Sequence, residues 1–258
     1  MRLQRARVQE NLVVRQGLHL LELQAPALAQ AVRPGQYCMV RCAEETSYDP
    51  LLRRPFFVHS VEGERCRLLF QVRGRGTAWL ARRLVGEELD LLGPLGQGWR
   101  LPSRTSTLLL VAEELGVVTL TLLAQRASEQ GLAVTLLQEV PRLEEGYPAT
   151  LLPEEVEYHL VERSAEQDPT RQDGLSAALE SYLSWADAVC LGVSRETALR
   201  LYRRFEPLRR PGFAQVAVLH PLVCGLGTCL ACALETAHGP RLICQEGPAF
   251  DLRTLAQA

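Results

Sequence analysis

The sequence predicts a multidomain protein made of an N-terminal antiparallel β-barrel, an α/β domain with a parallel sheet, and a small C-terminal cysteine module. Short apolar runs broken by Gly and Pro fill the first part of the chain. Apolar strands then alternate with amphipathic helices, and four cysteines gather near the C-terminus. We expect domain boundaries at residues 1–101, 102–215 and 216–258.

The first domain is predicted from short strands that end at turn residues. Pro34-Gly35 separates the first two strands, and Gly74 and Gly76 follow the third. Such punctuation is typical of a small antiparallel barrel. The predicted strands are residues 17–23, 36–42 and 65–72.

One helix is predicted inside the barrel sequence, over residues 77–85. Its apolar side chains Trp79, Leu80 and Leu84 are expected to face the core.

The second domain is predicted from a change of rhythm near residue 105. Continuous apolar strands alternate with amphipathic helices, which is typical of a parallel, doubly wound sheet. A polar stretch at residues 163–173 is predicted to be a loop. The predicted strands are residues 106–112, 133–137, 158–161, 188–191 and 215–219, and the helices end near residue 130 or span 173–184 and 195–205.

The cysteine module reads Cys224-Gly-Leu-Gly-Thr-Cys229-Leu-Ala-Cys232, then eleven residues, then Cys244. C-x₄-C-x₂-C…C is the ligand spacing of a plant-type [2Fe–2S] cluster, in which each iron takes two thiolates. The two glycines of the loop let it fold closely and bring N–H groups toward the sulfurs. The spacing therefore favours an electron carrier.

Zinc and disulfides are the alternatives for these cysteines. Structural zinc usually shows two separated C-x₂-C pairs or added histidines, and disulfides need an oxidising compartment. The N-terminus has charge but no apolar signal core, so we expect a cytoplasmic protein. The remaining cysteines, Cys38, Cys42, Cys66 and Cys190, lie in apolar surroundings and are predicted to be core residues.

Composition excludes several classes. A net charge of −2 gives no nucleic-acid footprint, and the apolar runs are too short to span a membrane. The chain has no lysine, which excludes a Walker-A loop and Schiff-base chemistry.

Two motifs in the barrel suit an anion. Arg53-Arg-Pro-Phe-Phe-Val58 offers arginines for charge-assisted bonds, and Gly74-Arg-Gly-Thr77 offers backbone N–H groups and a hydroxyl at a helix start. Each motif is weak alone.

The order of motifs is more specific. Arg-Pro, Gly-Thr, Gly93-Pro-Leu-Gly-Gln-Gly98, an α/β unit and a cysteine loop ending Cys244-Gln-Glu-Gly-Pro-Ala-Phe250 follow one another. This order resembles, nearly end to end, the electron-transfer subunit of two-subunit bacterial dihydroorotate dehydrogenase, in the ferredoxin–NADP⁺ reductase superfamily.

The resemblance implies FAD between barrel and α/β domain, with a [2Fe–2S] cluster close by. Electrons would run from NADH through both to the FMN of a separate catalytic subunit, which oxidises dihydroorotate in pyrimidine biosynthesis. A heterotetramer is expected, with no membrane or nucleic-acid partner and no catalytic residue in this chain. The residues implied at the flavin are Arg54, Pro55, Phe56, Phe57, Leu69, Phe70 and Gln71, those at its pyrophosphate Gly76 and Thr77, and those at the cluster Cys224, Cys229, Cys232 and Cys244.

The sequence departs from this pattern at the nicotinamide side. Phe57 stands where relatives have Ser or Thr, and Ala112-Glu-Glu-Leu-Gly116 stands where they have a glycine-rich turn. Cys190-Leu-Gly-Val193 replaces Cys-Gly-Pro, and only Asp173-Gly174 remains of Asp-Asp-Gly-Ser. Two carboxylates repel a pyrophosphate and obstruct backbone approach, so we expect NAD(H) binding to be weak or absent. A slight rearrangement that still binds NADH stays open.

Two other functions stay open as well. The chain could serve another oxidoreductase with a donor other than NADH, or be a cluster-bearing assembly subunit without flavin turnover. A bound-flavin spectrum separates the redox functions from the scaffold.

Overall fold

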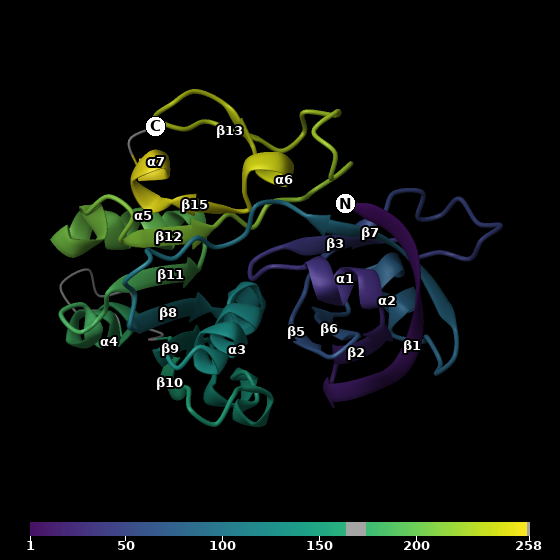
Figure 1. Ribbon diagram of the computed structural model, residues 1–258, viewed down its shortest axis with the longest axis horizontal. Coiled ribbons are helices and arrows are strands. Elements are labelled where there is room, and N and C mark those ends of the chain that lie inside the picture. Colours follow the sequence, from purple (N-terminus) through teal and green to yellow (C-terminus); the bar gives the residue numbers. More distant parts are fainter. Residues whose placement is uncertain (164–173, 257–258) are drawn as a thin grey trace.

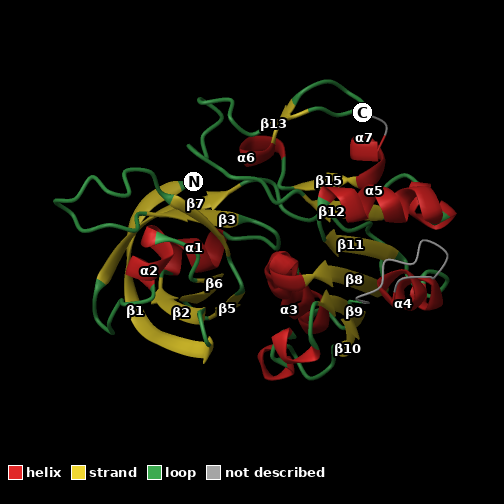
Figure 2. Ribbon diagram, turned by 180° about the vertical axis from the view of Figure 1, so that it is seen from behind, coloured by secondary structure: helices red, strands yellow, loops and turns green. Residues whose placement is uncertain are grey.

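The computed structural model describes residues 1–163 and 174–256. A curved β-sheet and an α/β unit lie side by side, and the segment that carries the cysteines covers one end of both (Figure 1). The view from behind in Figure 2 shows the same arrangement.

The first sheet is antiparallel throughout and curves into a half-barrel, seven strands in the described residues. Two short helices, α1 (Pro26–Ala31) and α2 (Arg75–Leu80), accompany it. All three predicted strands are confirmed within a residue or two. In sheet order the strands are β4 (Arg54–Phe57), β3 (Tyr37–Val40), β7 (Glu88–Leu95), β1 (Arg2–Arg15), β2 (Leu18–Gln24), β6 (Arg65–Gln71) and β5 (Ser60–Glu62).

The longest strand, β1, was not predicted. Only Ala6 and Val8 of its first half are buried, while the neighbouring Arg2, Arg5 and Arg7 are exposed. With so little apolar pattern, the strand depends on its neighbours β2 and β7, which pair along both of its edges.

The helix predicted over residues 77–85 lies earlier and is shorter. Leu80 is buried and Trp79 packs against the half-barrel core, but the expectation for Leu84 is wrong, since it is 69% exposed. The Asn11 side chain donates to the carbonyl oxygens of Leu80, Ala81 and Arg83 at 3.0–3.3 Å. These bonds satisfy the last carbonyls of α2, so the chain turns there.

The second sheet has the order β10-β9-β8-β11-β12-β15, and only β15 is antiparallel to its neighbour. Apart from the edge strand β10, which is half-buried, the strands are buried almost continuously, and their parallel pairing confirms the sheet predicted from the apolar runs. Their bounds are β8 (Thr107–Glu113), β9 (Ala133–Val140), β10 (Glu157–Glu162), β11 (Ala188–Gly192), β12 (Ala214–Ala217) and β15 (Ala249–Asp251).

Alternate residues of β8 face opposite layers. Leu108 and Leu110 pack with α3 (Thr121–Glu129), whereas Leu109 and Val111 pack with α4 (Gly174–Tyr182) and α5 (Arg195–Arg204). Helices therefore cover both faces, as a doubly wound sheet requires.

Two expectations for this unit need comment. The single helix expected after β8 is instead the 3₁₀ helix η1 (Glu114–Thr119) followed by α3. Glu114 takes a positive φ of 45°, which an α-helix does not allow. The loop predicted over 163–173 falls, apart from Arg163, outside the described residues.

Three further 3₁₀ turns, η2 (Leu143–Glu145), η3 (Ala149–Leu151) and η4 (Glu206–Arg209), connect these elements. In the described ranges, 1–163 and 174–256, none of the helices has the length and apolar character needed to cross a membrane.

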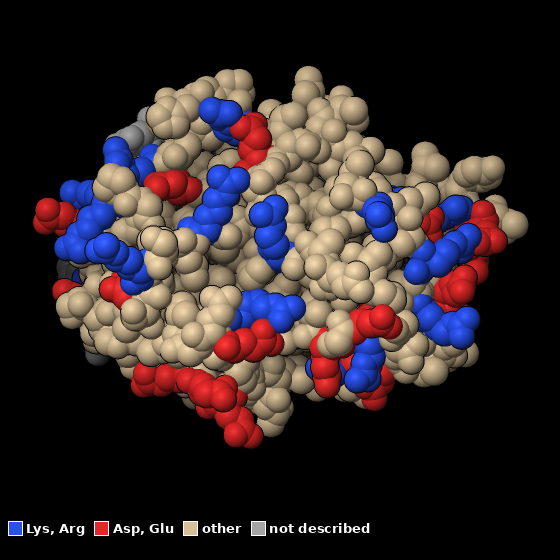
Figure 3. Space-filling view, in the orientation of Figure 1, with Lys and Arg blue, Asp and Glu red and all other residues tan. Residues whose placement is uncertain are grey.

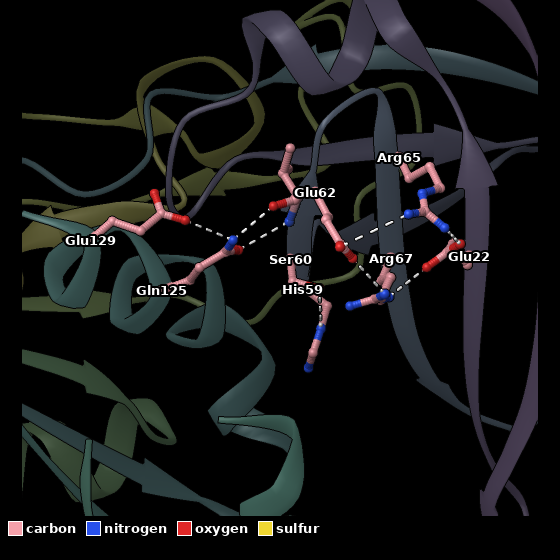
Figure 4. A network of polar contacts seen from close by, with 9 residues as sticks. Glu22, His59, Ser60, Glu62, Arg65, Arg67, Gln125 and Glu129 are labelled. Atoms are coloured by element: carbon pink, nitrogen blue, oxygen red, sulfur yellow. Dashed lines mark hydrogen bonds and ion pairs between the residues drawn. The ribbon is translucent and has the colours of Figure 1, made fainter. Parts of the chain in front are cut away.

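Polar contacts join the half-barrel to α3. Gln125 binds both the N–H and the C=O of Val61 on β5, at 3.0 and 2.7 Å (Figure 4). Thr121 donates to the His59 carbonyl at 2.8 Å, and the His59 ring contacts the Tyr147 hydroxyl at 2.5 Å. Burial lowers the pKa of His59 to about 3, so its ring is neutral at the interface.

Candidate functional site

The cysteine segment is an excursion from the second sheet. It leaves after β12, passes through the hairpin β13 (Ala233–Leu234) and β14 (Arg241–Leu242) and helix α6 (Ile243–Glu246), and returns as β15. Helix α7 (Leu252–Ala256) then packs on α5 and β12. Both ends of the cysteine segment are therefore anchored in the second sheet, at β12 and β15.

The loop that carries the first three cysteines lies on the half-barrel. A Cβ at Gly225, where φ is +70°, would come within 3.0 Å of Met39 Cγ and 3.2 Å of Leu95 Cδ1. A Cβ at Gly227, where φ is +77°, would come within 2.9 Å of Gln245 Cγ. Both turns therefore need glycine, for backbone conformation and for space.

The hairpin and α6 place the other end of the cysteine set. Cys232 and Cys244 are 3% and 1% exposed, and the Ile243 N–H donates to the Cys232 carbonyl at 3.1 Å. Tyr37 on β3 donates to the Cys244 carbonyl at 3.2 Å. Cys229 lies at the exposed tip of the loop.

The Cys224 sulfur accepts hydrogen bonds from several neighbouring groups. Burial raises its pKa, but N–H groups of Leu226 and Cys229 and the Cys229 and Thr228 side chains outweigh burial and lower the pKa to about 6. The Leu226 nitrogen lies 3.3 Å from Cys224 Sγ. Burial and the neighbouring Cys232 raise the pKa of Cys244 to about 12.

The four thiols are neighbours in this module: Cys229 helps to lower the pKa of Cys224, and Cys232 and Cys224 both help to raise the pKa of Cys244. Within residues 1–163 and 174–256, no three His, Cys, Asp or Glu side chains converge closely enough to hold a single metal ion. Four thiols in one small module fit a dinuclear cluster, which takes two thiolates on each iron. N–H groups aimed at a sulfur fit the same group.

The two arginines at the start of β4 have different surroundings. Arg53 donates to the Asp90 carboxylate at 2.6 Å and to the Asp90 carbonyl at 2.9 Å. Arg54 donates only to the carbonyls of Leu52, at 2.7 Å, and Arg53, and has no acidic partner in the described part of the chain. The Arg54 guanidinium is therefore the one left with charge to offer a ligand.

Gly76 lies against the stem of Arg54. A Cβ at Gly76 would be 3.4 Å from Arg54 Cγ and 3.3 Å from Cys42 Cβ. The Thr77 hydroxyl accepts from the N–H groups of Arg73 and Gly74, at 2.9 and 3.1 Å, and contacts the Gly74 carbonyl at 3.0 Å. The predicted Arg54 and Gly76 are thus brought together, while the Thr77 hydroxyl organises the start of α2.

The aromatic and apolar residues expected at the flavin point in different directions. Phe56 and Phe70 meet edge to face in the half-barrel core, 5.7 Å between centroids. Phe57 instead lies beside Tyr37, near the core shared with the cysteine segment. Pro55 is half-buried, Leu69 is buried against the α/β unit, and Gln71 is exposed and bonded to Arg73.

The turn after β8 holds its two acidic residues apart. Glu113 accepts from the Ser194 N–H at 2.7 Å and from the Thr197 hydroxyl at 2.5 Å, both at the start of α5. Glu114 pairs with Arg163, which also binds Glu139, at 3.0 and 3.1 Å. Of the Asp173-Gly174 remnant, Asp173 lies outside the described residues.

Several supporting residues were missed by sequence reasoning. Tyr37, Gln245 and Asn11 act through contacts with residues far away in the sequence, and no local pattern signals them. The buried positions of Cys38, Cys42, Cys66 and Cys190 are confirmed.

Two cavities lie away from these groups. One of about 250 Å³ opens between the half-barrel and α3, where His59, Arg67 and Gln125 already have partners. Another of about 530 Å³ lies beside β15, lined by residues such as Arg100 and Phe250. Charges of both signs mix over the face seen in Figure 3.

Residues 221–256 match the family described as the iron-sulfur cluster binding domain of dihydroorotate dehydrogenase B. The chain is 27% identical over 264 residues to the "Dihydroorotate dehydrogenase B (NAD(+)), electron transfer subunit" of Desulforamulus reducens, covering 95% of both chains. It is 29% identical over 251 residues to the protein of that name from Geobacillus thermodenitrificans, covering 89% of each.

Solved structures show the same fold. A structure of the NADH-dependent reduced ferredoxin–NADP oxidoreductase superposes with a TM-score of 0.77 at 19% identity, over 98% of this chain and 93% of that one. The ferredoxin reductase in carbazole 1,9a-dioxygenase superposes with a TM-score of 0.67 at 16% identity, over 85% and 70%. The chain has a ferredoxin reductase-like fold with a C-terminal iron–sulfur domain.

Proposed function

We propose that this chain is the electron-transfer subunit of a dihydroorotate dehydrogenase. In this role it passes electrons between FAD, a [2Fe–2S] cluster and the FMN of a catalytic partner subunit, for pyrimidine biosynthesis. The observation that carries the proposal is the cysteine segment, which gathers four thiols in one small module and contacts β3 of the half-barrel through Gly225 and the Cys244 carbonyl. Near full-length similarity to proteins named as such subunits supports it.

The proposed domains are residues 1–101 for FAD, 102–215 for the α/β unit and 216–258 for the cluster. Strands β12 and β15 join the last two into one sheet. The cluster module is therefore expected to move with the α/β unit as one body.

Each cofactor has residues suited to hold it. Arg54 would pair with the flavin pyrophosphate and Gly76 would let it approach the backbone, because Arg54 lacks an acidic partner among the described residues and Gly76 touches its stem. Pro55, Phe57 and Leu69 would flank the ring, whereas Phe56 and Phe70 would support it from the core. Cys224, Cys229, Cys232 and Cys244 would ligate the cluster. When bound, the flavin would exchange electrons in pairs or one at a time, and the cluster one at a time.

The partner subunit would meet the cysteine loop. Cys229 is exposed there, and the neighbouring Leu226 and Leu230 are 41% and 62% exposed. Leu230 also has a positive φ of 58°, a backbone conformation that is uncommon for leucine. Exposed apolar side chains beside a redox ligand suit a protein partner better than solvent.

A second function has an observation in its favour. Glu113 stands where the family resemblance implies a glycine, and its carboxylate is bonded to the start of α5, which favours an electron-transfer subunit whose donor is not NADH. A cluster-bearing assembly subunit is the remaining alternative, and a bound flavin would exclude it.

The test is anaerobic purification of the full chain with its spectrum, flavin content, iron and acid-labile sulfide. We expect about one FAD, two irons and two sulfides per chain. One zinc without sulfide would contradict the cluster, and absence of flavin would favour the assembly subunit.

A further inference from the structure

The second sheet has one topological switch point. The chain runs from β8 outward through β9 and β10, then returns to place β11 and β12 on the other side of β8. In such sheets ligands bind in the crevice between the carboxyl ends of the two central strands. Here that crevice lies between the end of β8 at Glu113 and the end of β11 at Gly192.

The Glu113 side chain spans this crevice. One carboxylate oxygen accepts from the Ser194 N–H and the other accepts from the Thr197 hydroxyl. Ser194 is the N-cap of α5, whose N-terminus attracts negative charge. The carboxylate thus meets the kind of donors that a phosphate would meet there.

The backbones on either side also touch. A Cβ on Gly116 would lie 1.8 Å from the Gly192 carbonyl oxygen, and one on Gly192 would lie 2.4 Å from the Gly116 oxygen. The Thr119 hydroxyl donates to the Gly116 carbonyl at 2.8 Å and holds this turn in place. Backbone contact between Gly116 and Gly192 therefore closes this part of the crevice.

The neighbouring acid has a separate role. Glu114 turns toward Arg163, on the side of β9 and β10, and its carbonyl accepts from Gln138 at 2.8 Å. The two acids are thus distinguishable by mutation, although they are adjacent in sequence.

We propose that Glu113 is a specificity-determining residue that excludes dinucleotides by occupying the switch-point crevice with its own carboxylate. This deepens the proposed function, on which its redox consequence rests: the flavin exchanges electrons with a donor or acceptor other than a nicotinamide bound in this crevice. Filling of the crevice by the Glu113 side chain can be distinguished from repulsion of the dinucleotide by its charge. If the side chain excludes dinucleotides by filling the crevice, a neutral side chain that keeps the bridge to α5 still excludes them.

The test compares three variants of the full chain carrying its cofactors. Glu113→Ala removes the bridge, Glu113→Gln keeps its shape without charge, and Glu114→Gln neutralises the adjacent acid. NADH affinity is measured by calorimetry, and flavin bleaching by stopped-flow absorbance. We expect Glu113→Ala to bind NADH at least about tenfold more tightly than the wild type, and both Gln variants to stay within about threefold of it.

Equal gains in Glu113→Ala and Glu113→Gln would show repulsion and overturn the proposal. A gain in Glu114→Gln, no gain in Glu113→Ala, or micromolar NADH binding by the wild type would also overturn it. If Glu113→Ala does not fold, Thr197→Val is used in its place, because it removes one of the two bonds to the Glu113 carboxylate. We expect its NADH affinity to rise about threefold, and no rise would contradict the proposal. Because calorimetry needs no flavin, a chain that lacks FAD would fail the proposed function while Glu113 is still tested.

Discussion

The proposed pyrophosphate site around Arg54 and the crevice beside Glu113 differ in whether the protein's own acidic groups already occupy their hydrogen-bond donors. At the half-barrel, Arg54 keeps a guanidinium without an acidic partner among the described residues. At the crevice, the donors at the start of α5 are already bonded to Glu113. A donor group without an acidic partner in the protein is free to bind an anionic ligand, whereas donors already bonded to a carboxylate of the chain stabilise the fold instead.

The largest expected effect sharpens the half-barrel side of this comparison, where the cysteine loop lies. Cys229→Ser removes one of four proposed ligands, and we expect iron and sulfide to fall from about two per chain to nearly none. Metal analysis and the EPR signal of the reduced protein measure it. Cys190→Ala is the matched control, because Cys190 is fully buried on β11, outside the loop. Full iron content in Cys229→Ser would exclude it as a ligand.

Gly116→Ala tests the closed crevice. The added Cβ would overlap the Gly192 carbonyl at 1.8 Å, so we expect the free energy of unfolding to fall by about 3 kcal/mol. Gly74→Ala is the control at the half-barrel, since a Cβ there meets nothing within 4 Å, and it should cost less than about 1 kcal/mol. Denaturant unfolding measures both. Equal stability of the two variants would mean that the crevice is open.

Arg54→Ala tests whether the Arg54 guanidinium, which has no acidic partner among the described residues, binds FAD. We expect FAD affinity to fall by roughly 2–3 kcal/mol, because a charge-assisted bond to the pyrophosphate is lost. Arg53→Ala, the adjacent arginine paired with Asp90, should lower stability and leave FAD affinity nearly unchanged. Flavin fluorescence during titration of deflavinated protein measures the affinity. Full FAD retention by Arg54→Ala would contradict the clamp.

The smallest expected effect concerns His59, at the contact between the half-barrel and the α/β unit. The folded-state pKa of His59 is about 3, below the ordinary value of 6.5, so the unfolded state binds more protons between these values. The free energy of unfolding is therefore highest above pH 6.5 and decreases as the pH is lowered, by about 2 kcal/mol at pH 5. His59→Gln should lose most of this pH dependence in denaturant unfolding between pH 5 and 7. An unchanged slope would mean that another group is responsible.

The β-strands show how much of the fold the sequence carries. Buried parallel strands such as β8 and β11 have continuous apolar runs and were predicted to within a residue, because both faces must be covered. Strand β1 alternates charged side chains with small apolar ones and was missed, since its edges are paired by β2 and β7. Leu84 was placed in the core by its helical spacing, but Asn11 ends that helix first.

The candidate sites divide in the same way. Cysteine spacing alone indicates a cluster, because ligands on one short loop must be close whatever the rest of the chain does. The flavin residues were expected as one contiguous set, yet Phe56 and Phe70 lie in the core while Phe57 faces the cysteine segment. Adjacent residues of a strand point to opposite faces, and only the assembled sheet shows which face meets which neighbour.

The sequence by itself determined the chemistry that this protein can offer: four thiols at ligand spacing, arginines and no lysine, and two carboxylates in place of glycines. Tertiary structure alone decided how those groups are used. It paired Arg53 with Asp90 and left Arg54 without an acid among the described residues, and it turned Glu113 toward α5 and Glu114 toward Arg163. The reason is that the partner of a polar group is set by which distant segments the fold brings within hydrogen-bonding distance, about 3 Å, and local sequence does not contain that information.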